Sequence, residues 1–230
     1  MSTGWAPEAG PRVRAEMAAL DRCPDVVDAA AARGITSVLH FTQLPGAVGI
    51  LHDDAVRCRA DLPTEKHLEF VYSPNAFDRS RDRAWHGYVN LSISLINRAM
   101  FQSSVSWHGD DHWVLFDFDI NMLGDPGVVF TTTNNAYADT IRRAEGLAGF
   151  EQMFRDRVPY GYYGSVHVRS TGKAAALTTD PQAEVLYPHE LNLSDLNAIL
   201  LQNEDDLESI EGVLAHFPHD VTVDVRPEVF

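Results

Sequence analysis

Apolar and polar residues alternate along several segments of this chain, which is the pattern of half-buried β-strands. The clearest case is segment 88–95, where Val89, Leu91, Ile93 and Leu95 alternate with polar, uncharged side chains. Successive side chains of a strand point to opposite faces, so this segment presents one apolar face and one polar face. β-Branched and aromatic content predicts further strands at 35–42, 113–120, 128–132, 182–187, 193–201 and 221–225.

Apolar residues three or four positions apart predict helices at 12–21, 25–33, 43–51, 138–157 and 205–216. Residues 1–10 contain Gly, Pro and Ser, and we expect them to be flexible. Most predicted strands follow one another without a crossover helix. The sequence therefore predicts an α+β fold with a largely antiparallel or mixed sheet, and 230 residues favour a single domain over 1–230.

The charge balance restricts the kinds of partner. Lysine and arginine total 18 against 33 aspartates and glutamates, which gives a net charge of -15. This charge excludes broad, nonspecific binding of polyanions but leaves room for a local basic groove. Lys66 and Lys173 are the only lysines, so an anionic partner would meet a few placed arginines, which suit planar recognition of phosphates and bases.

Neither a membrane span nor a signal peptide is predicted. No apolar run approaches the roughly 20 residues that cross a bilayer, and the N-terminus lacks a basic region followed by an apolar stretch. We therefore expect a cytoplasmic protein without membrane association. Its two cysteines, Cys23 and Cys58, form no motif and are expected to be reduced thiols.

Segment 182–187 combines an amide and a carboxylate on one face of an otherwise apolar strand. Alternation places Gln182 and Glu184 on one side, and Ala183, Val185 and Tyr187 on the other. A buried carboxylate is costly unless it is paired or used. The segment is therefore either an edge strand with a solvated face or part of a catalytic site.

A tyrosine-rich stretch precedes this strand. Residues 160–181 are the longest predicted irregular segment, and they contain Tyr160, Tyr162, Tyr163, Arg169 and Lys173 among glycines. Aromatic rings interleaved with positive charge suit stacking on unpaired bases. An ordinary connecting loop is the alternative.

Other polar positions could complete a pocket. The polar face of segment 88–95 carries Tyr88 and Ser92, and Arg98 follows the strand; His40 and Thr42 share one face of strand 35–42. Polar, uncharged strand faces are typical of ligand grooves. The alternating charges of residues 78–83 indicate either a solvated loop or a phosphate-contacting loop.

The sequence gives little support for a metal centre or for a catalytic serine or cysteine nucleophile. His108 and His112 have helical spacing, but Gly109 and two aspartates between them favour a turn between strands. No matching Cys or His pair occurs at zinc spacing, and no Gly-x-Ser-x-Gly elbow is present. We therefore expect no metal centre.

Four segments, taken in order, resemble the DarT-type DNA ADP-ribosyltransferase toxins. They are residues 39–51, 88–100, 129–136 and 182–186. The resemblance implies an ADP-ribosyltransferase fold, in which a split mixed sheet with flanking helices holds the co-substrate NAD+ in a central cleft.

The resemblance also implies roles for individual residues. Glu184 would bind the 2′-hydroxyl of the nicotinamide ribose and stabilise the oxocarbenium-like state, and Gln182 would help to position the acceptor. His40 would bind the adenosine-side ribose. Arg98 would contact a phosphate of NAD+ or the target base. The expected NAD+-binding set is His40, Thr42, Tyr88, Ser92 and Arg98, and segment 160–181 would be the substrate loop.

The implied activity is mono-ADP-ribosylation of a base of single-stranded DNA by a toxin, with a macrodomain-type antitoxin as partner. Whether the base is thymine or guanine stays open. Two alternatives remain: the same fold could act on RNA or protein or hydrolyse NAD+, or the chain could be a non-catalytic binding module.

Overall fold

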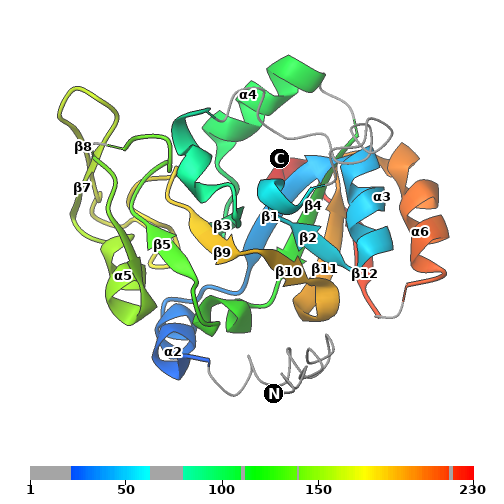
Figure 1. The fold of residues 1–230 in the computed structure, drawn as a ribbon, viewed down its shortest axis with the longest axis horizontal. Helices are drawn as coiled ribbons and strands as arrows, with labels where there is room; N and C mark the ends of the chain where they lie inside the picture. The colour runs from blue at the N-terminus through cyan, green and yellow to red at the C-terminus, as the bar shows by residue number, and fades with distance from the viewer. Residues whose placement is uncertain (1–21, 63–79, 110–111, 139, 218–219) are drawn as a thin grey trace, which may run out of the picture.

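The computed structural model describes residues 22–62, 80–109, 112–138, 140–217 and 220–230 (Figure 1). Segment 1–10, which was expected to be flexible, and the helix predicted at 12–21 lie outside the described residues, as do residues 78 and 79 of the alternating charge run.

An eight-stranded sheet is the centre of the fold, with the strand order β12-β11-β4-β1-β3-β9-β5-β6. Neighbouring strands are antiparallel except β11 and β12, which are parallel. The predicted α+β class with a mixed sheet is confirmed. The bounds are β1 (Val38–Gln43), β3 (Tyr88–Ile93), β4 (Trp113–Phe118), β5 (Val129–Thr131), β6 (Arg143–Glu145), β9 (Val185–Pro188), β11 (Leu196–Leu201) and β12 (Thr222–Val225).

Two small antiparallel sheets and several helices complete the described structure. The small sheets pair β2 (Ala55–Arg57) with β10 (Glu190–Asn192), and β7 (Arg157–Tyr160) with β8 (Ser165–Val168). The α-helices are α2 (Pro24–Ala32), α3 (Leu44–Asp53), α4 (Arg98–His108), α5 (Gly146–Gln152) and α6 (Leu207–Leu214). Short 3₁₀ segments are η1 (Arg59–Asp61), η3 (Ser80–Trp85), η4 (Ile120–Gly124), η5 (Leu193–Asp195), η6 (Glu204–Asp206) and η7 (Pro227–Val229).

The large sheet splits between β1 and β3. β1 pairs with β4 along all six of its residues, whereas its pairing with β3 is limited to Val38 with Ile93 and Leu39 with Ser92. From His40 onward the two strands no longer pair, and His40 Nδ1 lies 3.2 Å from the carbonyl oxygen of Asn90 on β3. A histidine side chain therefore spans the start of the split.

Each face of the sheet has its own hydrophobic core. On one face the buried side chains of Val38, Leu91, Phe116 and Phe130 belong to a large cluster. On the other face Leu39, Trp113 and Leu115 pack against Phe101 of α4. Figure 1 shows α3 beside α6 at one end of the sheet and α2 near α5 at the other. Within the described chain, no helix is long and apolar enough to span a membrane, and both Cys23 and Cys58 are unbridged.

The helix predicted at 138–157 is wrong. The chain instead forms β6, then α5, and then β7. Gly146 has φ +63° at the turn into α5, a conformation that L side chains rarely adopt. A Cβ on Gly149 would meet the carbonyl oxygen of Ala144 at 2.1 Å, so this close approach also requires glycine. The apolar spacing of this segment arises from two short elements that share one core.

Several predicted boundaries also change. β3 ends at Ile93, and Ser94 then has φ +61°; α4 continues to His108, so that histidine lies on a helix rather than in a turn between strands. The predicted irregular stretch 160–181 contains the end of β7 and all of β8. The strand predicted at 182–187 starts only at Val185, because the backbone N–H of Gln182 donates to Asp180 Oδ1 (2.8 Å) in a preceding turn. Gln182 and Glu184 thus precede β9.

Candidate active site

The backbone of Glu184 is fixed by Thr131, the last residue of β5. The Thr131 N–H donates to the Glu184 carbonyl oxygen (2.9 Å), and the Glu184 N–H donates to Thr131 Oγ1 (2.9 Å). The Thr131 hydroxyl in turn lies 2.9 Å from the carbonyl oxygen of Thr133, to which it donates. Thr131 is fully buried and Glu184 is 9% exposed. The backbone of Glu184, the residue before β9, is therefore held by buried hydrogen bonds to the end of β5.

The Glu184 carboxylate is held by the segment that follows β5. Glu184 Oε2 accepts a hydrogen bond from the backbone N–H of Asn135 (2.8 Å). Asn135 is itself clamped by Arg143 of β6, whose Nε donates to Asn135 Oδ1 (2.7 Å) and whose terminal nitrogen donates to the Asn135 carbonyl oxygen (2.9 Å). Burial lowers the pKa of Arg143, and attraction by the Glu184 carboxylate opposes this effect. Arg143 remains cationic, because the guanidinium group is not deprotonated in proteins.

Aromatic rings flank the same arginine. The Arg143 guanidinium lies 4.9 Å from the centroid of the Trp85 ring, which is cation–π geometry. Trp85 contacts Tyr88 of β3 with 5.1 Å between ring centroids. Three elements therefore converge beside Glu184: η3, β3 and the β5–β6 pair.

The polar face of β3 lies on the same side of the sheet as Glu184. Leu91 pairs with Val185, and residues paired across antiparallel strands point to the same face. One step along each strand, Ser92 and Glu184 share the opposite face, together with Asn90 and Tyr88. The predicted association of these positions with Glu184 agrees with the strand register.

His40 and Thr42 occupy a different position from Ser92. Leu39 pairs with Ser92, so alternation directs His40 and Thr42 toward the other face of the sheet. Thr42 is buried, while half-buried His40 reaches the backbone of β3 at the split. His40 is thus placed at the split rather than on the polar face of β3.

Arg98 and Gln182 occupy different places relative to Glu184. Arg98 is the exposed first residue of α4, and one of its guanidinium nitrogens lies 3.5 Å from the carbonyl oxygen of Glu228. This places Arg98 beside the last residues of the chain. Gln182 is half-buried and two residues from Glu184, with its backbone held by fully buried Asp180.

The tyrosines of the substrate loop belong to the β7–β8 hairpin. Tyr163 at its tip is 94% exposed. Tyr162 donates from its hydroxyl to the carbonyl oxygen of Ala136 (3.2 Å), the residue after Asn135. Tyr160 stacks on His167 with 3.8 Å between ring centroids. The hairpin tip therefore rests on the segment that holds the Glu184 carboxylate.

Arg169 and Lys173 are bound to the loop itself. Arg169 donates to the carbonyl oxygens of Leu177 (2.7 Å) and Ala174 (2.8 Å), and Lys173 Nζ donates to that of Thr179 (3.0 Å). Burial lowers the pKa of Lys173, and the nearby Arg169 lowers it further. These contacts hold the two cations against the backbone of their own loop.

The described residues contain no group of three His, Cys, Asp or Glu side chains placed to hold a metal ion. His112 lies instead against buried Asp206, with 2.6 Å between Nδ1 and Oδ1.

Sequence reasoning missed Thr131, Asn135, Arg143 and Trp85 as parts of the site. Thr131 and Asn135 fall in segment 129–136, one of the four segments of the family resemblance, and that was the available signal. Arg143 gave no such signal, because its segment had the apolar spacing of a helix.

Comparison with protein families identifies the chain. A family model described as "ssDNA thymidine ADP-ribosyltransferase, DarT" matches residues 39–230, which include every residue placed in the site above. The chain belongs to the DarT family. It is therefore an ADP-ribosyltransferase that acts on single-stranded DNA, and NAD+ is the ADP-ribose donor of this class of transferase.

Solved DarT structures share the fold. DarT of Thermus sp. 2.9 in complex with NAD+ has 16% identity and a TM-score of 0.59, with 85% of this chain and 97% of that chain covered. The complex of the same protein with ADP-ribosylated ssDNA has 16% identity and a TM-score of 0.62, with 85% and 96% covered. Thermosipho africanus DarTG in complex with ADP-ribose has 11% identity and a TM-score of 0.54, with 85% of this chain and 51% of that chain covered. A search of curated proteins gave no significant match.

Proposed function

We propose that this chain transfers ADP-ribose from NAD+ to a thymidine of single-stranded DNA, with Glu184 as the catalytic carboxylate. The observation that carries the proposal is the anchoring of Glu184, which is 9% exposed and hydrogen-bonded through Oε2 to the Asn135 N–H. Fixing a carboxylate in a buried position costs free energy. Such a group is suited to stabilise positive charge that develops during a reaction.

NAD+ supplies an electrophilic ribose carbon whose bond to the nicotinamide nitrogen breaks. The Glu184 carboxylate would accept a hydrogen bond from the adjacent 2′-hydroxyl and stabilise the positive charge on the ribose. Nicotinamide leaves as a neutral molecule with the bonding electrons. A thymine atom then bonds to the same carbon, and one proton is released, so atoms and charge balance.

The residues around Glu184 divide into positioning and binding groups. Arg143 is a positioning residue, because it acts on Glu184 through Asn135. His40 at the sheet split is proposed to bind the adenosine-side ribose, while Tyr88 and Ser92 on the Glu184 side would face NAD+. Gln182 would help to position the base.

Thr42 and Arg98 are the weakest members of the proposed set. Thr42 is buried, and Arg98 lies beside Glu228. NAD+ titrations of Thr42→Val and Arg98→Gln test them directly. An unchanged affinity would remove each from the NAD+-binding group.

We also propose that the protein is a cytoplasmic toxin with a macrodomain-type antitoxin that removes the ADP-ribose. The cytoplasm holds both NAD+ and DNA, and a DarTG protein is among the structural neighbours. Expression of this chain should arrest growth, and co-expression of a macrodomain hydrolase should restore it. Growth that is unaffected by the chain would reject the toxin role.

Parallel acceptor assays test the proposed activity. The chain is incubated with NAD+ and, separately, single-stranded DNA with thymidine, the same DNA without thymidine, RNA of matched sequence, or protein. The expected result is a mass gain of one ADP-ribose on the thymidine-containing DNA alone. Modification of RNA or protein instead would support the alternative acceptors, and NAD+ binding without any transfer would support a binding module.

A further inference from the structure

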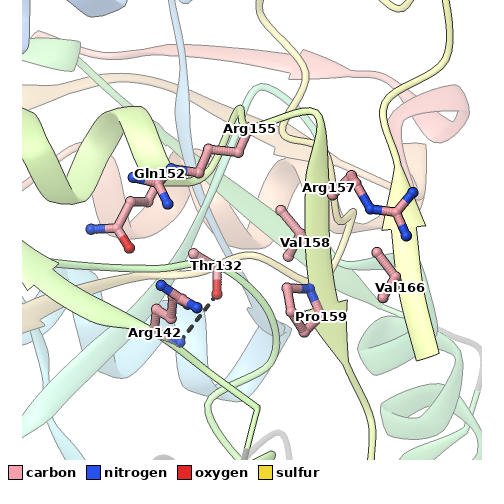
Figure 2. A pocket seen from close by; sticks show the side chains of 8 residues that line it. All are labelled: Thr132, Arg142, Gln152, Arg155, Arg157, Val158, Pro159 and Val166. Atoms are coloured by element: carbon pink, nitrogen blue, oxygen red, sulfur yellow. Dashed lines mark hydrogen bonds between the residues drawn. The ribbon is translucent and has the colours of Figure 1, made fainter. Parts of the chain in front are cut away.

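A pocket of about 170 Å³ lies beside the site described above, and three of the residues that line it are arginines from three segments. They are Arg142 before β6, Arg155 after α5 and Arg157 at the start of β7. Figure 2 shows the side chains of Arg142 and Arg155 on one side of β7, whereas the guanidinium of Arg157 points to the other side, toward β8. Thr132 also lines the pocket, while its neighbour Thr131 holds the backbone of Glu184. The pocket and the carboxylate site are thus joined through one peptide unit.

These arginines differ from four others in the described chain that are ion-paired. Arg22, Arg33, Arg57 and Arg226 each form an ion pair with an aspartate or glutamate. Among the described residues, none of the three pocket arginines has such a partner, although all three are exposed. In a chain of net charge -15, three cations without acidic partners around one pocket form a local site for an anion.

The pocket has further groups that suit a nucleotide phosphate. Thr132 Oγ1 accepts from the Arg142 N–H (3.1 Å), and its hydroxyl hydrogen is a donor. Guanidinium groups bind phosphate oxygens through paired N–H donors. Figure 2 shows Val158 and Pro159 of β7 beside these polar groups. Val158 is buried, whereas half-buried Pro159 offers an apolar surface on which a sugar could pack.

Strand β7 runs from the pocket to the tip of the β7–β8 hairpin, where Tyr163 lies. Arg157 and Tyr160 are the first and last residues of β7, so they are separated by about 10 Å at ~3.3 Å per residue. Exposed Tyr163 lies just beyond, at the tip. Nucleic-acid strands rise ~3.4 Å per nucleotide when stacked. A strand whose base stacks at the tip can therefore reach the pocket within a few nucleotides.

We propose that the pocket lined by Arg142 and Arg155, together with Arg157 on the other side of β7, binds the phosphate backbone of the single-stranded DNA, a few nucleotides from the modified thymidine. The proposal rests on the proposed function, because it requires a polynucleotide substrate. It explains how a strongly acidic protein holds DNA: the favourable contacts are confined to a few exposed arginines in one region of the surface.

Salt-dependent binding tests the pocket. The affinity for a fluorescent single-stranded oligonucleotide is measured by anisotropy at several NaCl concentrations, for wild type and for the double variant Arg155→Gln/Arg157→Gln. For single strands, each lost phosphate contact lowers the slope of log K against log[salt] by about 0.7 in magnitude. We expect that decrease, together with roughly tenfold weaker binding at low salt. Arg142→Gln should act in the same direction.

Arg226→Gln is the matched control, because it removes the same charge from an exposed arginine that is paired with Glu228. It should retain the wild-type slope. Equal slopes and affinities for the pocket variants and this control would overturn the proposal. Thermal melts verify folding, and a charge-reversed Arg157→Glu gives a second test, with a larger expected loss of affinity.

Two further measurements are needed. One shows whether the pocket binds a phosphate of NAD+ or of DNA, and the other distinguishes failure of the pocket assignment from failure of the proposed transferase function. Calorimetric titration with NAD+ alone should give the same affinity for the double variant and wild type. A loss of NAD+ affinity with an unchanged DNA slope would overturn the proposal by assigning the pocket to the dinucleotide. If wild type transfers no ADP-ribose to DNA, the proposed function fails. If wild type transfers it and the pocket variants do so with an unchanged KM for DNA, the pocket assignment alone fails.

Discussion

Replacement of Thr131 by valine tests whether the hydrogen bonds between β5 and Glu184 hold the site together. Valine has nearly the shape of threonine, so Thr131→Val leaves no large cavity. It removes the acceptor for the Glu184 N–H and the donor to the Thr133 carbonyl, each now at 2.9 Å. Both partners are in buried residues, so water cannot replace the lost bonds.

The expected cost follows from the number of orphaned groups. A buried donor or acceptor without a partner costs roughly 1–3 kcal/mol, so two such groups destabilise the fold by about 2–6 kcal/mol. In a chain of this size, 1 kcal/mol shifts Tm by about 2–4 °C. We therefore expect Tm to fall by about 4–24 °C. The rate of transfer to DNA should also fall, since Glu184 loses its backbone anchor.

Thermal melts and a transfer assay below the lowered Tm measure both effects. Thr131→Ser keeps the hydroxyl and should recover most of the stability and activity. Thr36→Val, at an exposed position before β1, controls for the same chemical change. A Thr131→Val variant that melts and reacts like Thr36→Val would refute the argument.

Three further predictions concern the site and its surroundings. Arg143→Met removes the clamp on Asn135 and should lower kcat about 10- to 100-fold with a smaller change in KM for NAD+, whereas a wild-type kcat would reject the positioning role. Tyr163→Ala should raise KM for DNA by fivefold or more without a change in Tm, since a stacked base contributes about 1–3 kcal/mol and the ring is exposed; an unchanged KM would remove this ring from DNA binding. Burial raises the pKa of Asp117 to about 6 from 3.8, so the folded state binds the proton more tightly and stability falls as pH rises from about 4 through 6. Asp117→Asn should therefore raise Tm at pH 7 and lose this advantage near pH 4, on the order of 2–3 kcal/mol before solvent screening; a constant difference would contradict the pKa assignment.

The alternation of apolar and polar residues was enough to predict β3, the strand whose polar face lies on the Glu184 side of the sheet. The alternation in segment 88–95 identified β3 and its polar face, and the strand register places Glu184 on that side. A slip of one residue would move every side chain of β3 to the opposite face of the sheet, so the alternation restricts the possible registers. The choice of Glu184 depended in addition on the resemblance to the family.

Other parts of the site depend on contacts between distant segments. Arg143 acts through Asn135, which then binds Glu184 49 residues further along the chain. No local pattern reports such a contact. The segment around Arg143 was also misassigned, because the chain turns from β6 into α5 at Gly146, within a stretch whose apolar spacing looked like one continuous helix. The arginine pocket was missed for the same reason, since its members belong to separate elements.

The start of β9 shows how a side chain overrides strand propensity. Asp180 is fully buried and accepts the Gln182 N–H, which holds a turn where alternation predicted strand. Glu184 therefore enters the site from the residue before β9 rather than from within a strand. Thr131 and Asn135 then hold its backbone and its carboxylate.

The most direct test of the account is nucleotide-resolved mass spectrometry of thymidine-containing single-stranded DNA after incubation with NAD+ and either wild type or Glu184→Gln. Glutamine keeps the size of the side chain and an oxygen for the Asn135 N–H, but it loses the negative charge. We predict one ADP-ribose on a thymidine with wild type and at least a hundredfold slower product formation with a folded Glu184→Gln variant, since removal of one preorganised stabilising group costs about 10²–10³ in rate. Equal product from the two proteins would contradict the central role of Glu184.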